Sequence, residues 1–357
     1  MSHELQEING EASYAGRAPA WHQLGTVIED LDYATAMRTA HLSDWNVRAV
    51  EFSAVLGGIG EDTNTDVPVR EFVTVDAPDH QIIVRDNPGT GAVESLGIVG
   101  ERYAAVQNED AFAVAPFLED LGATVETAGA IRGGRQVFLS MSLGGGFVID
   151  PEGANDRVQG YLLLRTSHDG SLAVEAAATY VRVVCANTFD MAMGKNAQRA
   201  YKVRHTATAG DRLAQAQAIL LRANGYGEAL GTLAAKLHRV PMSNAEFIDI
   251  VTDIYPQPES ESKRAHTLWE KKVDLLGDLF SGGGDVDYTL GNVSGTAWAG
   301  ANALTERIDW HRTARGGDGT SLAIAASGFT ASITNEKAQV FDRVVEWAKE
   351  KAPSVMA

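Results

Sequence analysis

The feature that most constrains this fold is a pair of long apolar runs joined by a short polar stretch. The first run is RVQGYLLLRT (157–166), the second is LAVEAAATYVRVVC (172–185), and SHDGS lies between them. Asp169 and Gly170 supply the positive φ angles that a tight hairpin turn requires. The runs therefore predict a long antiparallel β-hairpin. Because the second run exceeds the usual length of a strand, we expect a bulge or kink near its three alanines.

The residues before this hairpin predict a mixed α and β region. Strand-like segments at 45–52, 70–75 and 81–86 are bounded by turn residues, which is typical of a β-meander. Apolar periodicity predicts helices over 31–42, with Asp30 as N-cap, and over 108–121. Two further strands are expected around the RGG at 132–134, and a helix over 187–205 after the hairpin.

Beyond residue 206 the strand signals nearly vanish. The segment 211–240 has helical periodicity that we expect to be broken at Gly225 and Gly227 and ended by Pro241. Ser243 and Glu246 have the spacing of a capping box, and three more helical segments follow. We therefore predict an α+β fold, with an antiparallel sheet, long hairpin and packed helices in the N-terminal half and a helical C-terminal half. The expected domains are a mixed one with meander and hairpin–helix core (1–205) and a mainly helical one (206–357).

The composition bears on where such a chain works. No window approaches the roughly 18 uninterrupted apolar residues of a membrane-spanning helix, and the first residues lack the pattern of a secretory signal. Cys185 is the single cysteine, which agrees with a reducing compartment. We expect a cytoplasmic protein with no membrane partner.

The charge is unevenly distributed along the chain. A formal net charge of −17 argues against a general, charge-driven nucleic-acid binder. Residues 157–205 nevertheless carry seven basic and three acidic side chains, so 7 − 3 gives +4. This asymmetry has two readings, an anionic partner or a solvated basic face.

Catalytic motifs are weak in this sequence. Cys185 is followed by an expected helix start that would lower a thiol pKa, yet no histidine base lies at a favourable spacing; the alternative is a buried, small hydrophobe. No two histidines have the i, i+4 spacing of a helical zinc site. The glycine-rich stretches 143–150 and 281–287 lack the ending of a phosphate-binding loop. We therefore expect no cofactor and no metal, and we favour a non-enzymatic role over the alternative of an enzyme that depends on Cys185.

The remaining signal is Arg182 within YVRVVCANT (180–188). Alternation along a strand places Val181, Val183 and Cys185 on one face and Tyr180, Arg182 and Val184 on the other. The first set can be buried while Arg182 emerges beside Tyr180. An arginine and a tyrosine on one sheet face suit phosphate pairing and base stacking, although many exposed strands look the same.

Four segments carry a family resemblance. TSHDGSLAVEAAATYVRVVCANT, AGRAPAWHQLGT, YAAVQNEDAF and GTAWAGANALTERIDWHR occur in an order that resembles the phage/plasmid-like proteins grouped as domain-of-unknown-function family 932. Trp21 with His22 and the string 182–188 match the family's signature. The resemblance implies expression inside a bacterial host and brings no catalytic roles. The order of hairpin and basic helix is also similar to single-strand annealing proteins of phages, which assemble into rings or filaments.

Two functional hypotheses follow. The first is a DNA-metabolism protein of a mobile element that binds or anneals single-stranded DNA in recombination, as a homo-oligomer of the ring or filament kind. The second is a non-enzymatic protein-interaction or anti-defence factor that acts on host proteins. The candidate nucleic-acid-binding residues are Arg165, Tyr180, Arg182, Lys195, Arg199, Lys202 and Arg204.

Overall fold

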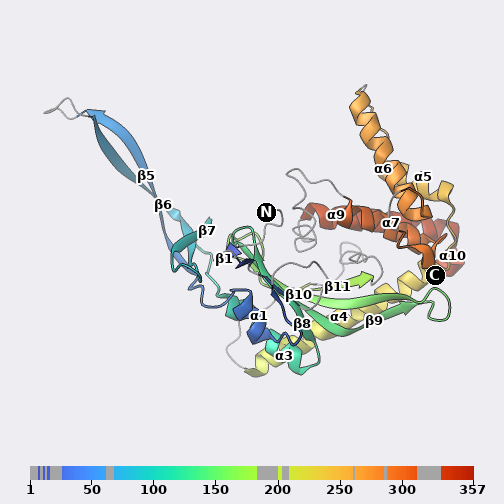
Figure 1. Ribbon diagram of the computed structural model, residues 1–357, viewed down its shortest axis with the longest axis horizontal. Coiled ribbons are helices and arrows are strands. Elements are labelled where there is room, and N and C mark those ends of the chain that lie inside the picture. The colour runs from blue at the N-terminus through green and yellow to red at the C-terminus, as the bar shows by residue number, and fades with distance from the viewer. Residues whose placement is uncertain are drawn as a thin grey trace.

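The structure is a computed structural model of the 357-residue chain. It describes residues 7–8, 11–12, 14–16, 26–61, 68–182, 200–202, 209–259, 262–284, 288–311 and 331–357. A β-sheet arm projects from one end of the molecule, a larger sheet occupies the middle, and helices gather at the other end (Figure 1). The α+β fold class predicted from the sequence is confirmed.

The central sheet has seven strands. They are β3 (Tyr14–Gly16), β4 (Thr26–Val27), β8 (Thr124–Ile131), β9 (Gln136–Ile149), β10 (Asp156–Ser167), β11 (Glu175–Arg182) and β12 (Ala200–Lys202). Their spatial order is β12-β11-β10-β9-β8-β3-β4, and only the β3–β4 pair is parallel. A separate two-stranded pair joins β1 (Glu7–Ile8) to β2 (Glu11–Ala12).

The predicted long hairpin is present as β10 and β11. Its register runs without a shift from Val158 opposite Arg182 to Arg165 opposite Glu175. Of the bulge or kink expected near the three alanines, this register excludes the bulge. The irregularity lies on the other side of β10, between Gln159 and Tyr161, where β10 pairs with β9. The connection spans residues 168–174, which is longer than the tight turn that the sequence predicted, although Gly170 has the expected positive φ of 76°.

The helix predicted over 187–205 is mostly outside the described residues. Where the structure describes this segment, residues 200–202 form strand β12 and pair with Glu175, Ala176 and Ala177 of β11. The prediction is wrong at these three positions. An open edge of β11 accepts main-chain hydrogen bonds from any extended segment, and a helical sequence pattern does not reveal such a partner.

One long helix covers a face of the central sheet. α4 (Ala209–His238) is continuous, so the break predicted at its two glycines is wrong. Ala178 and Tyr180 of β11 share an apolar cluster with Ala223 and Leu230 of α4. The opposite face of β11 is buried as well, since Ala177 is 1% exposed. The sheet therefore does not present one apolar and one solvent-exposed face at this strand.

The arm is a second, three-stranded antiparallel sheet. It consists of β5 (Arg48–Glu61), β6 (Pro68–Asp86) and β7 (Val93–Gly100), in that spatial order. β6 is one strand of 19 residues, where the sequence indicated two. β7 pairs only with residues 80–86 of β6, so the distal half of the arm is a two-stranded ribbon that extends away from the molecule (Figure 1).

Short helices fill the space between the arm and the central sheet. α1 (Tyr33–Thr39) is capped by Asp32, whose side chain accepts a hydrogen bond from the Thr35 amide, and not by Asp30 as predicted. The single helix expected over 108–121 is two, α2 (Asn108–Ala111) and α3 (Ala115–Asp120).

The C-terminal half is helical, as predicted. It contains α5 (Asn244–Ile254), α6 (Lys263–Ser281), the 3₁₀ turn η1 (Gly291–Val293), α7 (Ala297–Trp310), α9 (Ala331–Lys351) and α10 (Pro353–Met356). The capping box of Ser243 and Glu246 is confirmed. Buried Asp156 of β10 accepts a hydrogen bond at 2.9 Å from Trp298 Nε1 of α7, which ties the sheet to these helices. The division into domains at residue 205 stays a prediction.

Candidate functional site

Arg165 is the first residue of the predicted cationic surface. It is 9% exposed, and its Nε donates a hydrogen bond to Glu175 Oε1 at 2.7 Å. The same two side chains form an ion pair through Arg165 Nη2. A guanidinium that is shielded from water and neutralised by a carboxylate does not contact phosphates, so the structure corrects the role predicted for Arg165.

Tyr180 is a core residue. It is 4% exposed and lies between the rings of Phe147 and Tyr226, at centroid distances of 5.9 and 5.7 Å. Its hydroxyl donates a hydrogen bond to the Ala223 carbonyl at 2.9 Å, and burial raises the pKa of Tyr180 to about 12. The predicted stacking surface for a base is therefore wrong, because both ring faces are occupied by protein.

Arg182 and Lys202 are placed by their strands alone. Arg182 ends β11 opposite Val158, whereas Lys202 lies opposite Glu175 at the other end of this strand. The seven residue steps from Glu175 to Arg182 span about 23 Å at roughly 3.3 Å per residue. The pairing therefore places positions 182 and 202 at opposite ends of β11, and the joint role predicted for Arg182 and Lys202 stays a prediction.

The other predicted positions fall outside the described residues. These are Lys195, Arg199, Arg204 and Cys185. Among the residues that the structure does describe, no group of three or more His, Cys, Asp or Glu side chains is arranged to hold a metal ion. Within these same residues, no helix combines the length and the apolar character that crossing a lipid bilayer requires.

The arm presents an exposed apolar row that the sequence analysis did not identify. Val50 of β5, Ile82 of β6 and Ile98 of β7 are consecutive cross-strand partners and therefore share one side of the sheet. Val50 is 38% exposed and Ile98 is 54% exposed. We call this row the outer face of the arm. Val75, farther along β6, is also 47% exposed.

The other side of the arm is fixed to the body of the molecule. Ile83, Leu96 and Val99 are buried in the same apolar cluster as residues of the central sheet. Gly97 lies so close to the hairpin connection that an added Cβ would be 2.8 Å from Asp169 Cα. Tyr103, just after β7, donates a hydrogen bond from its hydroxyl to the Ser167 carbonyl at 2.8 Å. The outer face is therefore held in a defined orientation at the base of the arm.

A buried polar cluster lies behind this junction. The Arg85 guanidinium of β6 is fully buried, stacks 4.0 Å from the Trp45 ring and pairs with Glu94 at 2.8 Å. His168 is 1% exposed and its ring lies 5.6 Å from that of Trp45. These contacts join the arm, the segment after α1 and the hairpin connection into one unit.

Hydrogen bonds fix the tautomer of His168. Asn108 Nδ2 donates to the Leu42 carbonyl at 2.8 Å, which leaves Asn108 Oδ1 as the acceptor for His168 Nε2 at 2.9 Å. His168 therefore carries its proton on Nε2. Burial, with the nearby Arg85 charge, lowers the pKa of His168 to about 4.

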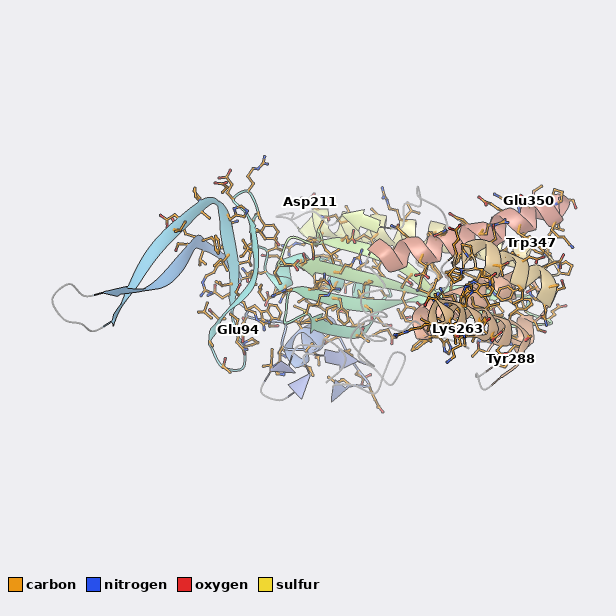
Figure 2. All side chains as sticks on the ribbon, turned by 90° about the horizontal axis from the view of Figure 1, so that it is seen from above. Glu94, Asp211, Lys263, Tyr288, Trp347 and Glu350 are labelled. Atoms are coloured by element: carbon orange, nitrogen blue, oxygen red, sulfur yellow. The ribbon has the colours of Figure 1, made fainter. Side chains whose placement is uncertain are left out.

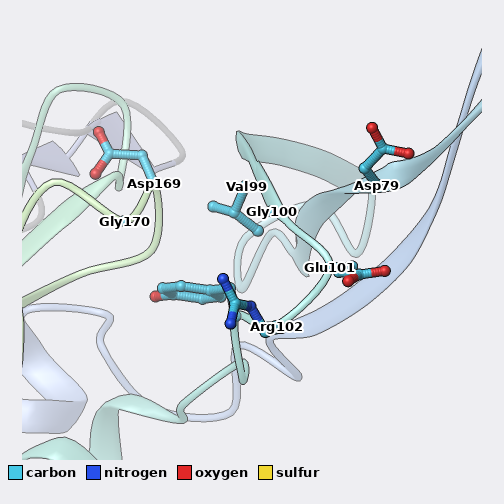
Figure 3. A pocket seen from close by; sticks show the side chains of 8 residues that line it. Asp79, Val99, Gly100, Glu101, Arg102, Asp169 and Gly170 are labelled. Carbon is cyan, nitrogen blue, oxygen red and sulfur yellow. The ribbon is translucent and has the colours of Figure 1, made fainter.

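An open hollow of about 560 Å³ lies between the base of the arm and the hairpin connection. Figure 3 shows Asp169 on one side of it, Asp79 and Glu101 on the other, and Arg102 between them. Three carboxylates against one guanidinium make this hollow unfavourable for phosphate groups. The hollow therefore does not suit the binding of a nucleic acid.

The charge of the arm has the same sign. Residues 48–61 and 68–80 contain two arginines and five carboxylates, so 2 − 5 gives −3. Glu51, Asp76 and Asp79 are exposed, and none of them forms an ion pair with the part of the chain that the structure describes. The outer face is therefore an apolar row on an arm of net negative charge, and Glu51, which pairs with Gln81, lies on the other side of the sheet from Val50.

The protein has an α+β fold with a seven-stranded sheet, a projecting β-arm and a C-terminal helical half. Within this chain, residues 95–327 match the model of the family described as Domain of unknown function (DUF932). The match begins in β7 and covers well over half of the chain. The chain belongs to this family. No curated protein and no solved structure matches it.

Proposed function

We propose that this chain is a non-enzymatic, protein-binding factor of phages or plasmids that uses the outer face of its arm to contact another protein inside the bacterial host cell. The observation that carries the proposal is the exposure of Val50 and Ile98 on a sheet whose opposite side is fixed to the body. An exposed apolar surface with a polar border is typical of protein interaction sites. The phage or plasmid origin rests on the resemblance described above.

The two-stranded part of the arm supports the same proposal. An isolated two-stranded ribbon is at best marginally stable in water and gains stability when a partner covers it. The net negative charge of the arm disfavours a phosphate backbone and favours a protein with basic side chains.

A charge placed on the outer face tests this proposal. We expect Val50→Glu with Ile98→Glu to abolish formation of complexes between this chain and its protein partner in cells that carry the phage or plasmid, because two carboxylates would have to be buried in an apolar contact. The measurement is co-purification with the tagged, full-length chain, quantified for each recovered protein against the wild type.

The matched control is Leu221→Glu. Leu221 lies on α4, outside the arm, and is 75% exposed, so the same chemical change there should leave complexes unaltered. Equal recovery of every partner by the arm variant and the wild type would contradict the proposal.

Single-stranded DNA binding is kept as a second proposal because one segment of the chain has a high net positive charge. Residues 182–204 contain five basic side chains, Arg182, Lys195, Arg199, Lys202 and Arg204, against Asp190 alone, so 5 − 1 gives +4. Such a density of cations on a short segment suits contact with phosphates. The burial of Arg165 and Tyr180 removes these two residues from the proposal.

Oligonucleotide titrations at several salt concentrations test the DNA proposal. Arg182→Ala with Lys202→Ala should weaken binding and lower the slope of log K against log salt by about 1.4, since each contact to a single strand contributes roughly 0.7. Arg165→Met with Glu175→Leu removes a buried pair without leaving an unpaired charge, and DNA affinity should not change. A loss of affinity in this second variant, or none in the first, would contradict the assignment.

A further inference from the structure

We propose that the protein bound by the outer face of the arm is a second copy of this chain, and that the contact on that copy is the N-terminal half of α6. This inference rests on the proposed function and adds the partner. The contact joins two different surfaces, so copies associate head to tail.

The α6 surface has the composition that the arm requires. Arg264, Leu268 and Lys271 lie on one side of the helix at i, i+4 and i+7, and Leu268 is 58% exposed. An exposed leucine between two cations is the counterpart of an exposed apolar row on an arm of net negative charge. We call Lys263, Arg264, Leu268 and Lys271 the α6 patch.

The charges of the two surfaces are opposite. Residues 262–272 contain four basic side chains and Glu270, so 4 − 1 gives +3, against −3 for the arm. Lys263, Arg264 and Lys271 make no ion pair within the described ranges. Opposite, unpaired charges on two surfaces of one protein steer two copies toward each other and exclude like contacts, arm to arm or patch to patch.

The start of α6 departs from the usual charge preference of a helix. Its first turn contains Lys263 and Arg264 and no acidic residue, and the Ser262 side chain makes no capping hydrogen bond. Cations at a helix N-terminus interact unfavourably with the helix dipole. The negative charge of the arm of a bound copy would reduce this repulsion.

The positions of the two surfaces favour association between molecules over contact within one molecule. The arm projects from one end and α6 from the other, in the view of Figure 1 and in the perpendicular view of Figure 2, where Lys263 is labelled among the helices. A contact between two different surfaces leaves one of each free on every dimer. Such contacts form rings when the rotation between copies closes and filaments when it does not.

Sedimentation velocity over a range of protein concentrations tests this inference. We expect the weight-average mass of the full chain to rise with concentration and to fall toward that of a single chain at about 0.5 M salt, where surface charges are strongly screened. The arm variant (Val50→Glu, Ile98→Glu) and the patch variant (Leu268→Glu, Lys271→Glu) should each remain single chains. Leu221→Glu should behave as the wild type. Circular dichroism and thermal unfolding confirm that each variant is folded.

A mixture of the two variants is the decisive sample in this experiment. The intact arm of the patch variant can bind the intact patch of the arm variant, so an equimolar mixture should form dimers and nothing larger. A mixture that stays monomeric while the wild type associates would overturn the head-to-tail contact. So would association that persists in either variant alone.

The failure of this inference is distinguishable from that of the proposed function. A wild type that remains a single chain at every concentration, while the arm variant still loses a host protein in cells, overturns self-association and leaves the arm as a binding surface. Loss of oligonucleotide binding in the patch variant, with no change in mass, would overturn the inference in favour of a nucleic-acid role for α6.

Discussion

Two glycines in α4 that are two residues apart should respond in opposite directions to the same substitution. Gly227→Ala should destabilise the protein, whereas Gly225→Ala should stabilise it. A Cβ on Gly227 would lie 2.1 Å from the Tyr180 hydroxyl oxygen and 2.4 Å from its ring, while nothing lies within 4 Å of a Cβ on Gly225. Tyr180 cannot move away easily because its ring is enclosed by Phe147 and Tyr226 and its hydroxyl is hydrogen-bonded.

The magnitudes follow from helix propensity and overpacking. Alanine is favoured over glycine in a helix by about 0.8–1 kcal/mol, which is the gain expected for Gly225→Ala. Gly227→Ala has the same gain, but forcing a methyl group into a filled core costs about 1–3 kcal/mol and more where the clash is severe. We expect a net loss of about 2 kcal/mol or more in the free energy of unfolding.

Urea unfolding of the two variants beside the wild type measures this difference. Gly225→Ala is the matched control, since it changes the same helix in the same way without the contact to Tyr180. Stabilisation by both substitutions would contradict the placement of Tyr180 in the core beneath α4.

Acid should weaken the junction between the arm and the body through His168. The folded-state pKa of His168 is about 4, below the ordinary value of 6.5, because burial and the Arg85 charge disfavour the imidazolium. The unfolded chain therefore binds a proton that the folded protein does not bind. The stability contributed by the neutral ring is fully present above pH 6.5 and is lost as the pH falls from 6.5 to about 4. At about 1.4 kcal/mol per pKa unit, the expected loss is about 3 kcal/mol.

The pH dependence of unfolding isolates this group. We expect His168→Gln to be less stable than the wild type near neutral pH, because the ring packing against Trp45 is lost, and to lose less stability between pH 6.5 and 4. Glutamine can still donate to Asn108 Oδ1, so the variant changes the titration more than the hydrogen bonding. Unfolding curves in urea at several pH values give the change in the free energy of unfolding with pH. If the free energy of unfolding changed with pH equally in the variant and the wild type, His168 would not be the group that binds a proton on unfolding.

Local patterns in the sequence predicted most elements of the fold. The hairpin followed from two apolar runs and a turn, and the start of α5 followed from Ser243 and Glu246 because both signals lie within a few residues. The helix break predicted at Gly225 and Gly227 was wrong because the reason for these glycines is not local. A glycine lowers helix propensity wherever it occurs, and only the tertiary structure shows that Tyr180 needs the space at position 227.

The outer face of the arm was not predictable from alternation because of a bulge in β7. Ser95 lies opposite Val84 and Gly97 opposite Ile83, so Leu96 is an extra residue between two pairs. Leu96 is fully buried while Ile98, two residues later, is 54% exposed. Without the bulge these residues would share one face of the strand. Strand pairing, which is non-local, decides which apolar residue reaches solvent.

The predicted cationic surface failed at Arg165 for a related reason. The sequence shows seven basic residues near the hairpin and does not show which carboxylate faces which guanidinium. The register that sets Arg165 opposite Glu175 converts a candidate phosphate contact into a buried ion pair. Composition reports the charge of a segment, whereas pairing across strands determines whether that charge is available.

The accessibility of position 98 inside the cell tests the central claim most directly, that the outer face of the arm is covered by protein when the molecule works. Ile98→Cys and Leu221→Cys, each in a chain with Cys185 replaced by serine, would be labelled with a maleimide in intact cells and again as dilute purified protein. Both sites are more than half exposed in the single chain, at 54% and 75%, and should react at comparable rates when dilute. We predict that position 98 alone becomes protected in cells, because a side chain in the centre of a protein interface is shielded from solvent and reagent. Equal labelling of the two positions in cells would contradict the account.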